Sequence, residues 1–188
     1  MKNLILLILL MIPLVSMAQL TVYKTFEDFK NQEGESYAIY YGHMHIGGKY
    51  RILVKQKRTD KEIKIKCKKI WGFTYKDQLF RSTGKTGSFA RLMYQGGIYY
   101  YENGVAHMGI LSSDAGQGNF SIGYFAYFSE GINSELFPYT NGKLRKLTKE
   151  FPEHETLFEC IKFSNKGKLF DRGNDYERIR TCLEDYGG

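Results

Sequence analysis

The chain has 188 residues, with 27 Lys and Arg against 20 Asp and Glu, so its formal charge is +7 at pH 7. Apolar residues make up 43% of the chain and aromatic residues 15%, a composition that excludes an intrinsically disordered protein. The length is that of one ordinary domain, or of one domain with an appendage.

The first 18 residues have the three-part pattern of a secretory signal peptide. A cationic start precedes a twelve-residue apolar run, and small residues end the segment at Ala18. The run is shorter than the roughly 20 apolar residues of a permanent transmembrane helix. No cysteine follows the predicted cleavage after Ala18, so no acceptor for a bacterial lipid anchor is expected. We therefore predict a signal peptide over 1–18 and a soluble, unanchored domain over 19–188 that is periplasmic or extracellular.

Residues 37–140 carry mostly strand signals, preceded by a short helix predicted over Thr25–Phe29. Two strands are expected over 50–57 and 62–71. In the second, apolar residues alternate with lysines, and the two-residue period of a strand places the lysines on one outward face. The dipeptide Asn103-Gly104 lies between strand-like runs and predicts a tight hairpin, because both turn residues adopt positive φ.

Toward the C-terminus the apolar residues recur at helical spacing, which predicts two or three helices over 141–188. The last of them is expected to begin at Asn174. These elements predict an α+β fold that is mostly β: an antiparallel meander or barrel-like sheet of about seven to nine strands, with a short N-terminal helix and C-terminal helices. We expect one exported domain over 19–188, with a β-rich part over 37–140 and a helical part over 141–188.

Three cysteines follow the predicted leader: Cys67, Cys160 and Cys182. An oxidising compartment would allow one disulfide and leave one thiol over. We favour the pair Cys160 and Cys182, because both lie in the helical part whereas Cys67 is expected on a strand and inward. Three buried free thiols in a small core are the alternative.

The lysine-rich hairpin is a candidate binding surface. Between Lys49 and Lys69 the chain has ten Lys or Arg against two acids. Such a cluster attracts anionic partners; an acidic glycan, a lipid head group or another envelope protein would fit, and nucleic acid is not favoured. Lysines on an exposed strand also prevent edge-to-edge aggregation, which is the alternative. The residues predicted to bind are Lys55, Lys57, Arg58, Lys64, Lys66 and Lys68.

Two histidines are a candidate metal site. On a strand, His43 and His45 point to the same face and could share zinc or copper with His107 or His154. The alternative is an exposed pair beside a glycine turn. A second candidate surface is a group of strand tyrosines, of which one face is expected to be core and the other could be a platform for sugar or peptide. The default for that second face is core packing with half-exposed cross-strand pairing. The tyrosines are Tyr99, Tyr100, Tyr101, Tyr124 and Tyr127.

No motif in the chain predicts catalysis. G-x-S-x-G and H-E-x-x-H are absent, and no cysteine has a recognised protease or redox context. The segment Thr83–Gly87 lacks the earlier glycine of a phosphate-binding loop, so nucleotide binding is rejected. We predict no catalytic residues and no cofactor; a hydrolase with an unrecognised acid pair is an alternative.

The chain resembles the short secreted proteins of unknown function found in Bacteroidota. The resemblance rests on the leader ending Ser-Met-Ala-Gln and on four segments: Val22–Lys30, Lys69–Phe73, Gly97–Glu102 and Lys143–Lys149. It implies an exported, β-rich fold and no established reaction. The leading hypothesis is therefore a non-enzymatic exported protein that binds a macromolecular or anionic partner through the basic hairpin or the aromatic strand face.

Overall fold

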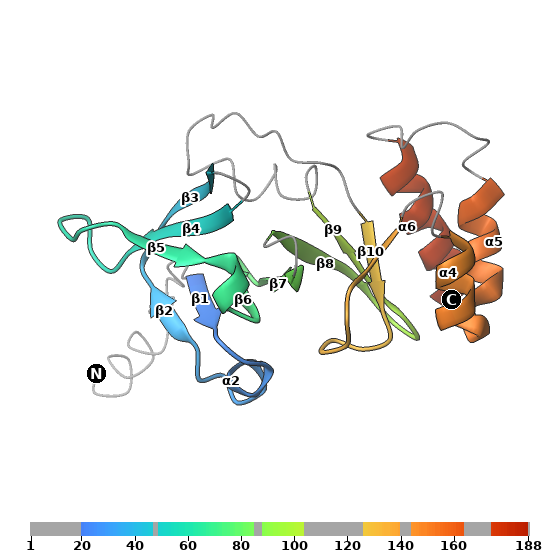
Figure 1. The fold of residues 1–188 in the computed structure, drawn as a ribbon, viewed down its shortest axis with the longest axis horizontal. Coiled ribbons are helices and arrows are strands. Elements are labelled where there is room, and N and C mark those ends of the chain that lie inside the picture. Colours follow the sequence, from blue (N-terminus) through green and yellow to red (C-terminus); the bar gives the residue numbers. More distant parts are fainter. Residues whose placement is uncertain are drawn as a thin grey trace, which may run out of the picture.

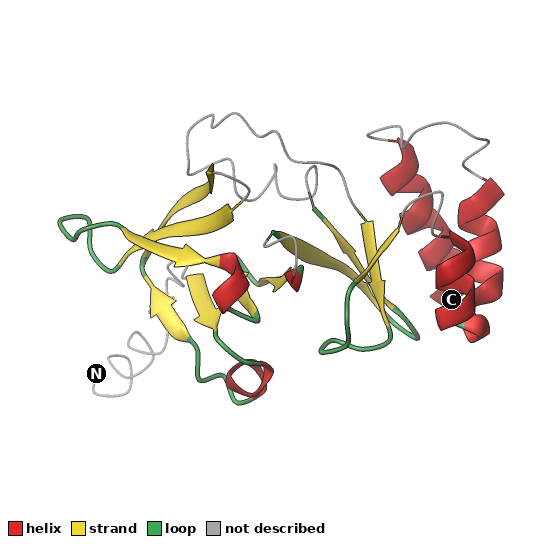
Figure 2. Cartoon of the chain, in the orientation of Figure 1, coloured by secondary structure: helices red, strands yellow, loops and turns green. Residues whose placement is uncertain are grey.

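The computed structural model describes six stretches of the chain (Figures 1 and 2): 20–46, 49–84, 88–103, 126–139, 144–163 and 174–187. Within them, only the backbone is described at 41–46, 49, 144, 162–163 and 174–175. The predictions that lie outside the described residues are the signal peptide over 1–18, most of Thr83–Gly87, the strand expected after Gly104, and the candidate residues His107 and Tyr124.

The described residues form eleven strands in two antiparallel sheets. The smaller sheet has the order β3-β4-β5, with bounds Ile39–Ile46, Lys49–Lys55 and Ile63–Lys66. The larger sheet contains β1 (Leu20–Tyr23), β2 (Glu35–Tyr37), β6 (Gly72–Tyr75), β7 (Gln78–Ser82), β8 (Phe89–Gln95), β9 (Tyr99–Glu102), β10 (Ala126–Ser129) and β11 (Phe137–Tyr139). Its order is β11-β10-β9-β8-β7-β6-β1-β2. The mostly β class is confirmed, with more strands than expected because several have only three or four residues and no readable period.

The helices lie at the two ends of the chain, as predicted. α2 (Phe26–Lys30) begins after Thr25, whose hydroxyl accepts a hydrogen bond from the Asp28 N–H while the Asp28 carboxylate accepts from the Thr25 N–H. At the C-terminus the helical elements are α4 (Leu144–Glu150), the 3₁₀ helix η4 (Pro152–His154), α5 (Glu155–Phe163) and α6 (Asn174–Gly187). No helix in the described part of the chain is long and apolar enough to span a bilayer.

In the N-terminal half, residues 20–84, the smaller sheet packs against one end of the larger one. Ile52 and Val54 of β4 are completely buried in one cluster with Phe73 and Phe80 of the larger sheet, and Phe89, from the C-terminal half, completes this cluster. A single residue separates β2, in the larger sheet, from β3, in the smaller sheet, so the chain passes directly from one sheet to the other. The two sheets therefore share one core, in which about half of the buried residues are aromatic.

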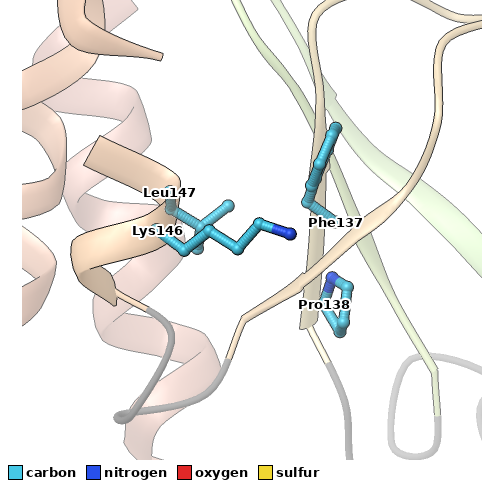
Figure 3. A pocket seen from close by; sticks show the side chains of 4 residues that line it. All are labelled: Phe137, Pro138, Lys146 and Leu147. Atoms are coloured by element: carbon cyan, nitrogen blue, oxygen red, sulfur yellow. The ribbon is translucent and has the colours of Figure 1, made fainter. Parts of the chain in front are cut away.

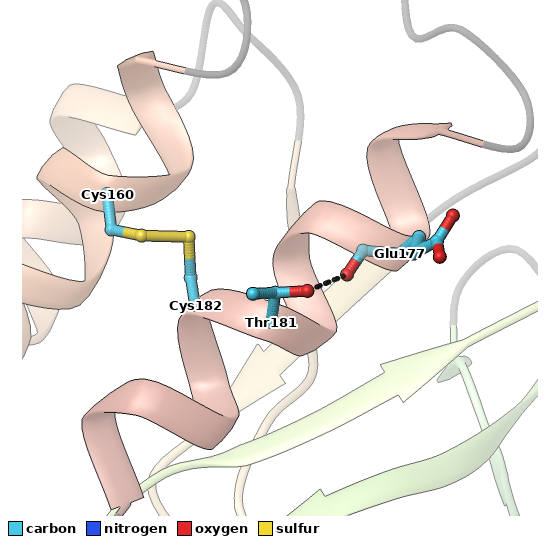
Figure 4. Close-up of a disulfide and its surroundings, with 4 residues drawn as sticks. All are labelled: Cys160, Glu177, Thr181 and Cys182. Atoms are coloured by element: carbon cyan, nitrogen blue, oxygen red, sulfur yellow. Dashed lines mark hydrogen bonds between the residues drawn. A yellow bond between two sulfur atoms is a disulfide. The ribbon is translucent and has the colours of Figure 1, made fainter.

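In the C-terminal half, residues 88–187, α4–α6 cover one face of β8–β11 (Figure 1). Tyr100 and Phe128 of the sheet pack in one buried cluster with Phe158 of α5 and Ile179 of α6. A disulfide joins Cys160 of α5 to Cys182 of α6, the pair favoured from the sequence (Figure 4). Cys67 is free and buried.

The strand expected over 62–71 is wrong in its second half. β5 ends at Lys66, and Cys67–Lys69 form the 3₁₀ helix η1. The Cys67 carbonyl accepts one hydrogen bond from the Ile70 N–H and another from the Ser82 hydroxyl of β7. These two bonds replace ladder bonds, so the chain turns here and enters β6.

Candidate anion-binding face

The basic residues of β4 and β5 lie on the outer surface of the smaller sheet. The register pairs Ile52 with Ile65 and Val54 with Ile63 on the inner side. Because side chains alternate along a strand, the residues between them point outward. We call this outer surface the basic face; it consists of Arg51, Leu53, Lys55, Lys64 and Lys66.

Two cations oppose one another directly on the basic face. Arg51 is the cross-strand partner of Lys66, and Lys64 is the partner of Leu53. Like charges directly opposite in a sheet destabilise it. Arg51 is half-buried, and its Nε forms no hydrogen bond with any described residue. Arg51 thus lies opposite another cation, and its Nε has no acceptor among the residues whose side chains the structure describes.

The acids near the basic face are few and already engaged. Between residues 50 and 69 the chain has nine Lys or Arg against Asp60 and Glu62. Asp60 accepts a hydrogen bond of 2.9 Å from the Lys57 N–H and so closes the β4–β5 turn. Glu62 lies 3.5 Å from Lys64 Nζ, and because both side chains are exposed this ion pair is weak. Within residues 50–69 these two acids therefore offset only part of the positive charge.

The structure brings together only some of the residues predicted to bind an anion. Lys55, Lys64 and Lys66 share the basic face, whereas Lys57 and Arg58 lie in the turn at one end of it. Lys68 belongs to η1 and follows the other end of β5. Arg51 was missed, although the two-residue period along β4 places it on the face of Lys55.

The histidine prediction rests on side chains outside the described set. On β3, the register pairs the backbone of His43 with Ile52 and that of His45 with Tyr50. His154 lies buried in η4, 2.9 Å through Nδ1 from the Tyr186 hydroxyl. Across the described stretches, no three His, Cys, Asp or Glu residues are placed to hold a metal ion. A zinc or copper site at His43 and His45 stays a prediction.

The strand tyrosines do not form an exposed platform. Tyr100 is buried under the helices, and Tyr101 and Tyr127 are buried on the opposite face of the sheet, where Leu136 packs against them. Tyr99 is half-buried beside them, and Tyr124 lies outside the described residues. Burial, followed by the nearby Glu102 carboxylate, raises the pKa of the Tyr100 hydroxyl well above its ordinary value.

A buried ion pair was not predicted from the sequence. Glu102, at the end of β9, is completely buried and accepts two hydrogen bonds from Arg180 of α6, of 2.8 and 2.5 Å. These hydrogen bonds raise the pKa of the Arg180 guanidinium. Arg91 lies opposite Glu102 on β8 and donates to the Gln78 side chain at 3.1 and 2.8 Å. The pair joins α6 to the sheet.

A small apolar pocket lies between β11 and α4 (Figure 3). Phe137, Pro138, Lys146 and Leu147 line it, and its volume is about 50 Å³. Ligand pockets occupy roughly 300–1,000 Å³, so this one is too small for a cofactor or substrate.

No protein-family model, curated protein or solved structure matches the chain. What this protein binds must therefore be inferred from its own residues.

Proposed function

We propose that this protein is an exported, non-enzymatic binding protein whose basic face holds an anionic macromolecule. The observation that carries the proposal is the position of Arg51, which lies directly opposite Lys66 and whose Nε donates no hydrogen bond to the described residues. A bound anion would lie between such cations and remove their mutual repulsion.

Protection of a sheet edge explains only part of this surface. β5 is an edge strand of the smaller sheet, and lysines on edge strands discourage aggregation, which accounts for Lys64 and Lys66. Arg51 lies on β4, the central strand, where no edge needs protection. Binding of an anion accounts for all three cations.

Export is supported by two features that are independent of the basic face. The first is the leader-like segment over 1–18. The second is the disulfide between Cys160 and Cys182, because such bonds persist in oxidising compartments and are rare in the cytosol.

The test is the binding of the secreted chain, residues 19–188, to a sulfated glycan at increasing salt concentration. We expect affinity to fall steeply as salt screens the cations, and the double substitution Arg51→Gln/Lys66→Gln to weaken binding by at least about tenfold. The matched control is Arg145→Gln/Lys149→Gln, which removes two exposed cations from α4. The proposal would be overturned if the affinity did not depend on salt concentration, or if the two double variants changed the affinity equally.

A further inference from the structure

The outer edge of β5 has no strand partner among the described residues. β5 is the last strand in the order β3-β4-β5, and its register is with β4 alone. An unpaired edge presents a row of backbone N–H and C=O groups that a further strand can bind. This edge borders the basic face, because Lys64 and Lys66 are residues of β5.

Ile63 on the same strand is exposed although it belongs to the inner side. It pairs with Val54, which is completely buried, yet Ile63 keeps 40% of its surface exposed. No other large apolar side chain in the described part of the chain is exposed. Ile65, two residues along, is half-buried at the rim of the core. An apolar side chain added beside β5 would complete this inner layer.

A partner at this edge of β5 therefore has to match two sets of side chains that alternate along the strand. On the outer side, Lys64 and Lys66 lie two residues apart, which is about 6.6 Å along a strand. On the inner side, Ile63 and Ile65 have the same spacing and need apolar cover. A glycan or a lipid surface would neutralise the lysines, but it would leave the backbone edge unpaired and Ile63 exposed.

We infer that the anionic partner is an acidic peptide segment that adds to β5 as a further strand. Its alternate residues are acids, which face Lys64 and Lys66, and the residues between are apolar, which cover Ile63 and Ile65. Pairing of β5 with the β5 strand of a second copy of the protein is unfavourable, because lysine would then face lysine. This inference rests on the proposed function and names the class of partner for the same surface.

The experiment uses a seven-residue peptide of alternating Glu and Val and two N-methylated forms of it. One form carries backbone methyl groups on every Glu, the other on every Val. Backbone N–H groups of alternate residues point to the same edge of a strand, so each form blocks one edge without changing charge. We expect one form to bind at least about tenfold more weakly than the parent and the other to bind like the parent.

Two variants test the side chains. Lys64→Gln/Lys66→Gln should weaken binding of the parent peptide, whereas Arg145→Gln/Lys149→Gln should not. Ile63→Ser should weaken binding of the peptide and leave binding of the sulfated glycan unchanged. A peptide of alternating Lys and Val is expected not to bind.

The outcomes separate this inference from the proposed function. If the two methylated peptides bind alike, strand addition is wrong; the proposed function then still stands provided that the sulfated glycan binds in a manner that depends on salt and on Arg51 and Lys66. If neither the glycan nor the peptide shows such dependence, both fail.

Discussion

The two halves of the molecule differ in how their charged side chains are paired. In the C-terminal half the buried Glu102 carboxylate receives both hydrogen bonds from Arg180, and the pair ties a helix to the sheet. In the N-terminal half Arg51 and Lys66 face each other on an outer surface. One nearby acid accepts a hydrogen bond within the β4–β5 turn, and the other pairs with an exposed lysine. The first arrangement holds the fold together, whereas the second is unfavourable for the isolated protein. Stability and binding are therefore expected to depend on different residues.

The largest expected effect comes from breaking the buried pair. Arg180→Met leaves the Glu102 carboxylate buried without its main partner, and we expect a loss of about 3–5 kcal/mol in the free energy of unfolding. Urea denaturation measures it. The control is Arg145→Met, an exposed arginine of α4, with an effect within about 0.5 kcal/mol. Equal effects from both would mean that Glu102 and Arg180 contribute little to stability.

Removing the disulfide should rank next. Cys160→Ser/Cys182→Ser opens a loop with a sequence separation of 22 residues, and the chain-entropy model gives a loss of about 3 kcal/mol. Reduction should lower the stability of the native protein by a similar amount and leave that of the double variant unchanged. Cys67 should not interfere, because burial raises the pKa of its thiol to about 12 and keeps it protonated near neutral pH. A reductant effect on the double variant would contradict this.

The contact between the two halves supplies a third, smaller test. Arg81 of β7 is buried, donates hydrogen bonds to the carbonyl oxygens of Ile132 and Ser134, and lies 4.6 Å above the Trp71 ring. Arg81→Met leaves those carbonyls unpaired, and we expect a loss of about 2 kcal/mol. Lys61→Met, at an exposed position between β4 and β5, is the matched substitution. An equal loss in both variants would show that these hydrogen bonds do not hold the halves together.

The smallest expected effect is a gain, rather than a loss, in the free energy of unfolding. Arg51→Gln removes the repulsion of Lys66, so we expect the protein to become more stable by about 0.5 kcal/mol while it loses affinity for anions. Denaturation at low salt shows the gain best, because added salt screens the repulsion in the native protein. A less stable variant would mean that Arg51 supports the fold, and the contrast between the two halves would then disappear.

Local patterns predicted the parts of the fold that local interactions form. The cap at Thr25 and the helical spacing after residue 143 gave α2 and α4–α6, since each depends on residues a few positions apart. The pairing of Cys160 with Cys182 followed from their common place in the helical part. The end of β5 was missed because it depends on Ser82, a residue of another strand.

The candidate site was predicted only in outline for the same reason. The two-residue period placed Lys64 and Lys66 on one face, but the opposition of Arg51 to Lys66 depends on the β4–β5 register. The core packing expected by default for the strand tyrosines is found for Tyr101 and Tyr127, and Leu136, from the connection before β11, packs against both. Glu102 and Arg180 are 78 residues apart, a distance at which no periodicity connects them.

The hydrogen bonds of Arg81 have a consequence for acid tolerance. Main-chain carbonyl oxygens do not titrate, and a guanidinium group keeps its proton in proteins. The contact between Arg81 and the Ile132 and Ser134 carbonyls therefore has no proton to gain as the medium becomes acidic. This contact between the two halves should therefore persist at acidic pH.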